Sequence, residues 1–285
     1  MSAYVQPGEP GVGPPSLDEL MRAENFPVAT RLLPARHRAH LLAVYRFARL
    51  VDDIGDRAPP DRRPLLLDQV EEDLRRIHAG TTPRLPSLRP LAATVRACAI
   101  PATPFHRLVE ANRQDQVISR YETFDQLLAY CKLSAEPVGR IVLHVFGVAT
   151  PDRMALSDRV CAALQIIEHC QDVGEDYRAG RIYLPQEDLR RFGCADRDMA
   201  ASDTPTRLRG VVALEAGRAR RLLDEGAGLI GRLGGFARLA VAGYVAGGRA
   251  ALSAIEDGAY DVLAGPPRPR RTRLLLEWSR SMGGR

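Results

Sequence analysis

Lysine is almost absent from this chain of 285 residues: Lys132 is the only lysine among 40 lysine and arginine residues. The formal net charge at pH 7 is +5, a balance that nucleic-acid binding proteins often show. The arginines are spread among acidic residues, however, and do not gather with aromatic side chains into a stripe. We therefore expect no nucleic-acid partner, and we attribute the shortage of lysine to coding bias.

Long apolar runs and cysteine motifs are missing as well. The best candidate for a membrane-spanning segment, 233–245, is interrupted by Arg238 and is too short to cross a bilayer. The N-terminus lacks the basic and then apolar pattern of a secretion signal. The cysteines form no C-x-x-C pair and are odd in number, so we expect reduced thiols in a cytoplasmic protein. They are Cys98, Cys131, Cys161, Cys170 and Cys194.

Motifs for acyl transfer and nucleotide binding are also lacking. No G-x-S-x-G and no P-loop occur. A literal G-x-G-x-x-G at Gly226, Gly228 and Gly231 follows a helical pattern and not a strand, so it lacks the context of a dinucleotide site. We expect no NADPH cofactor. His37 and His40 share a helix face without further ligands, which disfavours a histidine metal site.

The apolar residues recur with helical spacing, and no alternating strand pattern is present. With 45% hydrophobic residues, the chain can bury a large core in one all-α domain with helices around a central cavity. We expect a disordered segment at 1–15, the domain at 16–263 and a basic C-terminal tail at 264–285, which we expect to be frayed and solvated. The predicted helices are 16–23, 36–56, 64–79, 88–98, 104–118, 123–147, 152–178, 206–231 and 236–263.

Two aspartate pairs of identical spacing carry the functional signal. Asp52 and Asp56 in DDIGD continue an inward-facing helical stripe, so their two carboxylates point in one direction. Asp172 and Asp176 in DVGED lie 120 residues later, and Gln165 and Glu168 precede them on the same helix face. Carboxylates at this density would be costly to bury without cations. Two such helices facing each other predict a Mg²⁺ cage for a diphosphate.

A single D-x-x-x-D motif has little specificity. Asp257 and Asp261 form a third one in EDGAYD, and the ordinary interpretation of such a pair is a solvated helix face. Arg49, one turn before Asp52, could grip a phosphate oxygen with two parallel hydrogen bonds or belong to a surface ion pair. Whether the two aspartate pairs predict a metal site therefore depends on the sequence around them.

That surrounding sequence resembles the squalene and phytoene synthases, the head-to-head branch of the isoprenoid synthases, from Glu24 to about Leu263. The matching stretches are LLPARHRAHLLAVYRFARLVDDIGD at 32–56, YC and AEPVG within 130–139, LQIIEHCQDVGEDYRAGRIYLP at 164–185 and YVAGGRAALSAIEDGAYDVL at 244–263. The resemblance implies the isoprenoid synthase fold. It also implies that Asp52, Asp56, Glu168, Asp172 and Asp176 hold metal ions, that Arg49, Gln165, Arg181 and Tyr244 contact substrate, and that Tyr130 lies near the reacting carbons.

Departures from the phytoene synthase pattern point to one branch of this family. ENFPV at 24–28, SAEPVG at 134–139, Gln171 in place of an arginine, and the segment 105–131 resemble bacterial hydroxysqualene synthases. This branch implies ionisation of presqualene diphosphate, rearrangement of the cation and capture by water, in squalene and hopanoid biosynthesis. Glu168, where many members carry asparagine, and Gln171 make the second site more negative than the family pattern.

Two other functions stay open at this point. A phytoene or dehydrosqualene synthase would keep the same aspartates, although SAEPVG and Gln171 argue against it. A catalytically silent member acting as a binding or assembly factor would have no reason to retain paired carboxylates. The family also implies association with neighbouring enzymes of the squalene route. The arginine-rich segment 266–273 beside LLLEW could contact the inner face of an anionic membrane.

Overall fold

The computed structural model of the chain describes residues 32–283. This part is all-α, as predicted, and its only strand-like feature is an isolated bridge between Arg120 and Ile182. The predicted segment 1–15, the predicted helix 16–23 and the ENFPV stretch lie outside the described residues. The helices are α2 (Ala35–Arg57), α3 (Arg63–His78), α4 (Arg89–Cys98), α5 (Ala102–Gln114), α6 (Phe124–Ser134), α7 (Glu136–Val145), α8 (Pro151–Gln171), α9 (Val173–Arg178), α10 (Gln186–Arg191), α11 (Asp196–Met199), α12 (Thr206–Gly226), α13 (Gly235–Asp257) and α14 (Arg271–Gly283), with 3-10 turns η1 (Pro86–Leu88) and η2 (Ala227–Arg232).

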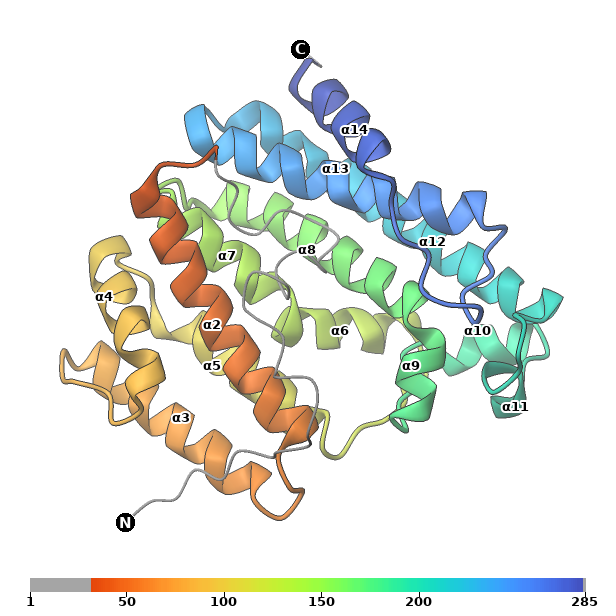
Figure 1. Cartoon of the computed structure of the whole chain (residues 1–285), viewed down its shortest axis with the longest axis horizontal. Helices are drawn as coiled ribbons and strands as arrows, with labels where there is room; N and C mark the ends of the chain where they lie inside the picture. Colours follow the sequence, from red (N-terminus) through yellow and green to blue (C-terminus); the bar gives the residue numbers. More distant parts are fainter. Residues whose placement is uncertain (1–31, 284–285) are drawn as a thin grey trace, which may run out of the picture.

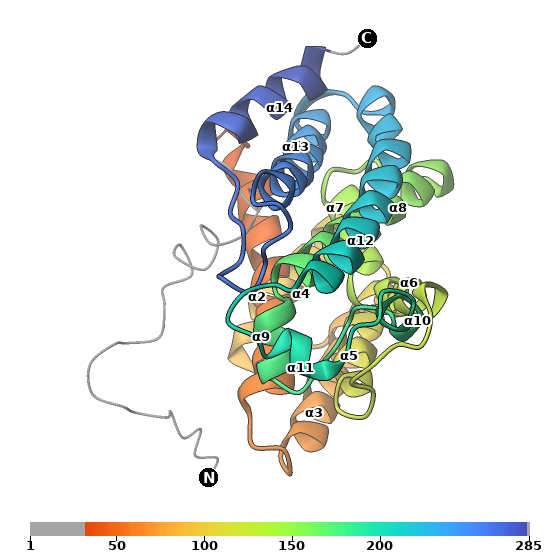
Figure 2. The same ribbon diagram turned by 90° about the vertical axis from the view of Figure 1, so that its right-hand side faces the viewer.

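Helix α8 lies at the centre, packed against α12, α13, α7 and α6, and α2 packs against α5 and α7 (Figure 1). One apolar cluster is built mainly from α8, α12 and α13, and a second from α2 to α5 and α7. Tyr244 and Phe146 pack against both clusters. Figure 2, turned by 90°, places α14 at one end of the molecule and α3 at the other.

Two of the long predicted helices are interrupted, for local reasons. The predicted helix 123–147 is split at Ala135, because Pro137 has no N–H to donate within a continuous helix. The predicted helix 152–178 departs from helical geometry only at Asp172, where φ is −100° and ψ is 15°. Hydrogen bonds from Asp172 N to Glu168 O (2.9 Å) and from Asp176 N to Asp172 O (2.8 Å) continue the ladder on both sides. The predicted face of the second motif therefore survives with a local kink.

Gly226, the first glycine of the G-x-G-x-x-G, ends α12 where this helix crosses α8. A Cβ at this position would lie 2.9 Å from the carbonyl oxygen of Leu156 and 2.7 Å from a methyl group of Val160. The glycine is needed for close helix packing, because any side chain would push the two backbones apart. The prediction that this motif follows a helix and not a strand is confirmed.

The expectation of a frayed C-terminal tail is wrong for residues 271–283. They form α14, which packs along α13 and buries Glu277 and Ser281. The expectation gave the arginines of this segment too much weight, because the apolar residues between them recur at helical spacing and the helix reaches the core through Trp278.

Candidate active site

The first aspartate pair lies at the C-terminal end of α2. Asp52 is half-buried at the edge of the cavity and accepts a hydrogen bond from Asn112 Nδ2 of α5 (3.3 Å). Burial raises the pKa of Asp52 to about 6, since the charges around it do not fully compensate the lost hydration. Gly55, between the two aspartates, admits this contact, because a Cβ there would collide with the Asn112 side chain. Asp56 is exposed, one turn further on.

Arg49 lines the same end of the cavity, one turn before Asp52. Its Nη2 donates to Asp53 (2.9 Å), so its partner in this structure is the second aspartate of DDIGD. Its Nε is buried and has no hydrogen-bond partner among the described residues. A buried donor without a partner is costly, and an anionic oxygen at the mouth of the cavity would satisfy it.

The second motif faces the first across the cavity. Gln165 and Glu168 of α8 line the cavity, as Asp52 does from α2. Asp172 follows at the kink, and burial together with the nearby charges of Asp176 and Glu175 raises its pKa to about 6. The structure therefore places Glu168 across the cavity from Asp52, with Asp172 one turn beyond Glu168 and outside the cavity lining.

Arg181 joins the two motifs directly. Its Nη2 donates to Asp56 Oδ1 at 2.5 Å, although the two residues are 125 positions apart in sequence. Arg181 is largely buried and follows α9, so it crosses from the second motif to the end of α2. Among residues 32–283, no three His, Cys, Asp or Glu side chains converge as ligands of one metal ion. The five predicted ligands thus occur as two separate groups, one on each side.

Behind the carboxylates lies a buried cluster that sequence reasoning largely missed. Tyr130 O–H donates to Asp115 (2.8 Å), and Tyr183 O–H donates to the other oxygen of the same carboxylate (3.3 Å). Burial raises the pKa of Asp115, and the two hydroxyl donors and the charge of Arg181 oppose this rise. Only Tyr130 was predicted. A signal for Asp115 existed, since it follows Leu108 by seven residues and so shares its inward face.

His169 completes this cluster. Its ring stacks on Tyr183 with centroids 3.8 Å apart, and it is buried. Its two nitrogens lie 3.2 Å from Gln165 Nε2 and 3.7 Å from Asp176. His169 therefore links Gln165 to the second aspartate pair.

Below the polar mouth, the cavity is apolar and has a volume of about 260 Å³. Leu41, Val44 and Ala48 of α2 form one wall, and Val160 and Leu164 of α8 face them. Tyr244 of α13 also lines it, where the resemblance implied a contact with substrate. An elongated apolar chamber under a polar, carboxylate-bearing mouth suits an amphiphile with an anionic head and a hydrocarbon tail.

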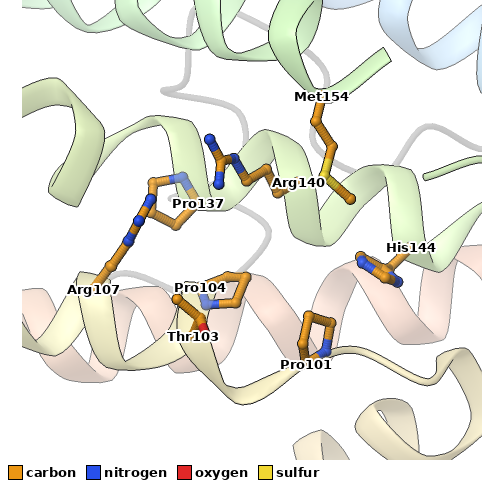
Figure 3. Close-up of a pocket in the computed structure, with 8 residues that line it drawn as sticks. All are labelled: Pro101, Thr103, Pro104, Arg107, Pro137, Arg140, His144 and Met154. Carbon is orange, nitrogen blue, oxygen red and sulfur yellow. The ribbon is translucent and has the colours of Figure 1, made fainter. Parts of the chain in front are cut away.

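Helix α7 separates this cavity from a smaller pocket of about 220 Å³ on its other face (Figure 3). Arg140 and His144 of α7 project into that pocket, with Arg107 on the facing α5. Arg140 donates through Nε (2.9 Å) and Nη2 (2.7 Å) to Asp158 of α8. This bidentate pair fixes α7 to α8, and with it the wall of the main cavity.

Three residues of the second motif, Gln171, Asp172 and Asp176, do not line the cavity. Gln171 is buried, and its amide donates to the carbonyl oxygen of Pro267. This bond holds the segment that carries Arg268, whose positive charge partly offsets the rise in the pKa of Asp172. Asp176 lies beside His169 and not on the cavity wall.

The third D-x-x-x-D has a structural role. Asp257 is exposed at the end of α13. Asp261 accepts hydrogen bonds from Thr204 Oγ1 and from Arg209, both at 2.8 Å. Neither lines the cavity. The same spacing therefore places aspartates at the candidate site in two motifs, whereas the third motif has a structural role in a loop.

The family model for squalene/phytoene synthase matches residues 21–278. The chain belongs to the squalene/phytoene synthase family. It is an enzyme of this class. A hydroxysqualene synthase of Sinorhizobium fredii is 37% identical over 79% of this chain and 76% of its own length. A phytoene synthase of Mycobacterium tuberculosis is 33% identical over 74% of this chain and 70% of its own length.

Solved structures share the fold. A squalene synthase, HpnC, from Alicyclobacillus acidocaldarius is 41% identical, with a TM-score of 0.77 over 84% of this chain and 89% of that one. A dehydrosqualene synthase solved with a ligand is 26% identical, with a TM-score of 0.83 over 92% of this chain and 93% of that one. The implied isoprenoid synthase fold is thereby confirmed.

Proposed function

We propose that this protein is a hydroxysqualene synthase, which ionises presqualene diphosphate, allows the cation to rearrange and captures it with water. The observation that carries the proposal is the apolar cavity whose mouth holds Asp52 and Arg49 on one side and Gln165 and Glu168 on the other. Hydroxysqualene synthases of Sinorhizobium fredii and Zymomonas mobilis, 37% and 35% identical, support this choice within the family.

The residues at the mouth fit Mg²⁺. Burial raises the pKa of Asp52 and that of Asp172 to about 6, so a cation bound beside either carboxylate would stabilise its charged form. Their donors are carboxylate oxygens, and Mg²⁺ is often held by one or two carboxylates together with substrate phosphates. Asp52 and Asp56 would hold the metal on one side, and Glu168, Asp172 and Asp176 on the other. Bound there, Mg²⁺ would neutralise charge on the leaving diphosphate.

The protein's own groups would divide the remaining tasks. Arg49, whose Nε lacks a partner among the described residues, would donate to a phosphate oxygen. Arg181 would turn part of its guanidinium group from Asp56 to the diphosphate. Departure of the diphosphate would then be coupled to the Arg181–Asp56 contact that joins the two motifs. The apolar walls would exclude water from the cation until rearrangement is complete. Tyr130, held by Asp115, would present an aromatic face near the reacting carbons.

A head-to-head coupling activity is the second candidate. The phytoene synthase of Mycobacterium tuberculosis and the dehydrosqualene synthase structure are also similar to this chain, and the same carboxylates would serve either reaction. A catalytically silent binding or assembly factor is a third and weaker candidate. Pairs of carboxylates without positive partners destabilise a fold, and a protein without metal chemistry would gain nothing from keeping them. Association with other enzymes of the squalene route stays a prediction.

The test is product analysis by gas chromatography and mass spectrometry. Purified protein is incubated with Mg²⁺ and, separately, with presqualene, farnesyl and geranylgeranyl diphosphates. Hydroxysqualene from presqualene diphosphate supports the proposal, whereas dehydrosqualene or phytoene from the simple prenyl substrates assigns a coupling activity. Asp172→Ala should abolish turnover, and Asp257→Ala is the matched control, since it removes an exposed aspartate of the same motif away from the cavity. Turnover retained in Asp172→Ala contradicts the carboxylate mechanism.

A further inference from the structure

Large apolar side chains are exposed along one edge of the molecule. On α14, the exposed fractions of Leu275 and Leu276 are 62% and 42%, and that of Met282 is 36%. Phe236, at the start of α13, is 44% exposed. Arg238 Nη2 of α13 donates to the carbonyl oxygen of Met282 (2.9 Å), which places the end of α14 beside the start of α13. These four side chains are called the apolar edge below.

The segment that leads into α14, together with the helix itself, is strongly basic. Residues 264–283 contain five arginines and a single acid, Glu277. Two of the arginines, Arg273 and Arg280, share that carboxylate at 3.4 and 2.9 Å. Among the described residues, Arg270 and Arg271 make no ion pair and no side-chain hydrogen bond. Exposed leucines flanked by arginines without anionic partners complement a surface that is apolar inside and negatively charged outside.

The cavity runs toward the same edge. Along α2 its lining proceeds from Asp52 at the mouth to Leu41, near the start of the helix. The apolar end is completed by Leu229 of η2 and Val241, close to the start of α13. Figures 1 and 2 both show the starts of α2 and α13 and the whole of α14 on the side of the molecule away from α3. The apolar end of the chamber is therefore the end nearest the apolar edge.

We propose that the apolar edge docks on the surface of an anionic lipid bilayer. The leucines of α14 insert between the acyl chains, while Arg270 and Arg271 contact lipid headgroups. Within residues 32–283 no helix is long and apolar enough to span a membrane, so the docking is peripheral. Docking in this orientation turns the apolar end of the cavity toward the lipid. If the proposed function holds, an oily C30 product then has a short path into the bilayer.

The experiment is co-sedimentation of the purified full chain with vesicles of phosphatidylcholine alone or mixed with phosphatidylglycerol. The wild type should bind the mixed vesicles and lose this binding as NaCl is raised. Leu275→Ser with Leu276→Ser should lower binding to mixed vesicles about tenfold or more. Arg270→Ser with Arg271→Ser should lower it by about fivefold for each arginine, because each contributes roughly the same headgroup attraction. The control is Leu65→Ser on α3, which removes an exposed leucine (53%) from the opposite side.

The readout involves no turnover, so it is independent of the proposed reaction. The arginine pair makes no described side-chain contact, and its replacement therefore leaves the fold intact and keeps the test valid even if the leucine variant unfolds. Equal binding to both vesicle types, or an equal loss in Leu65→Ser and in the α14 variants, overturns the proposal. A dimer in sedimentation velocity without vesicles, dissociated by Leu275→Ser with Leu276→Ser, would also overturn it, because the edge would then be covered by a second copy.

Discussion

Replacing Asp52 by asparagine should stabilise the metal-free protein while abolishing turnover. The pKa of the Asp52 carboxyl is about 6 in the folded chain, against an ordinary value of 3.8. A difference of about two units corresponds to roughly 3 kcal/mol of unfolding free energy that the charge costs at pH 7. Since Asp52 is only half-buried, solvent screening reduces the expected gain to about 1–3 kcal/mol. Asparagine keeps the oxygen that accepts from Asn112.

The pH dependence has a definite sign. Because the folded pKa lies above the unfolded one, the protonated carboxyl is favoured in the folded chain. The cost of its charge is absent below about pH 4, grows between pH 4 and 6 and is complete above pH 6. The stability gain of Asp52→Asn should therefore be greatest at pH 8 and about half as large at pH 5.

The assay is urea unfolding in EDTA at both pH values, repeated with Mg²⁺ and inorganic diphosphate. The ligands should stabilise the wild type by mass action and the variant much less. Asp53→Asn is the control: it removes the neighbouring charge, which pairs with Arg49 (2.9 Å) and Arg57 (3.3 Å), and should cost up to about 1 kcal/mol. An Asp52→Asn variant that is less stable than the wild type at pH 8, or equally affected at pH 5 and pH 8, would refute the reasoning.

Three further predictions concern other parts of the site and its frame. Arg181→Gln should lower kcat/KM by at least about tenfold while Arg178→Gln does not, and equal kinetics would remove Arg181 from the substrate site. Glu215→Gln should stabilise the protein increasingly as pH rises from about 4.5 to 8, because burial raises the pKa of Glu215 to about 8 even though Arg218 donates to its carboxylate (2.6 Å). A gain that does not change with pH in urea unfolding would contradict this. Gly139→Ala should lower the free energy of unfolding by about 1–3 kcal/mol in the same assay, since its Cβ would lie 2.4 Å from Ser157 Oγ. Gly228→Ala should leave stability unchanged, because a Cβ there would have no neighbour within 4 Å. Equal losses in the two variants would argue against the close approach of α7 to α8.

Much of the helical frame followed from local patterns in the sequence. Spacing predicts an inward-facing stripe through Leu41, Tyr45, Ala48, Asp52 and Asp56. The first four residues line the cavity on α2, whereas Asp56 is exposed and does not. Helical periodicity is set by neighbours three and four positions away, so it can be read without knowing the rest of the fold. Helix ends were predicted less well. The break before Pro137 has a clear local cause, but the pattern of apolar residues runs through it unchanged.

Only part of the candidate site could be predicted from the sequence. The sequence predicted both aspartate pairs. It did not distinguish Asp115 from other acidic residues, because Tyr130 and Tyr183, which donate hydrogen bonds to it, come from two other segments. The contact between Arg181 and Asp56 spans 125 residues and has no local signature. Gln171 was expected to alter the charge of the site, and the structure turns it toward Pro267. Such contacts depend on which helix faces are brought together.

By itself, the sequence determined the all-α class, the face of each aspartate motif and the family, because these depend on periodicity and on short runs of residues. The tertiary structure alone decided which charges are compensated. Asp261 and Asp172 belong to motifs of the same spacing, yet Asp261 accepts hydrogen bonds from Thr204 and Arg209, while Asp172 is half-buried beside other acids. Chemistry at a site depends on hydration and on nearby charge, and both are set when distant segments pack together.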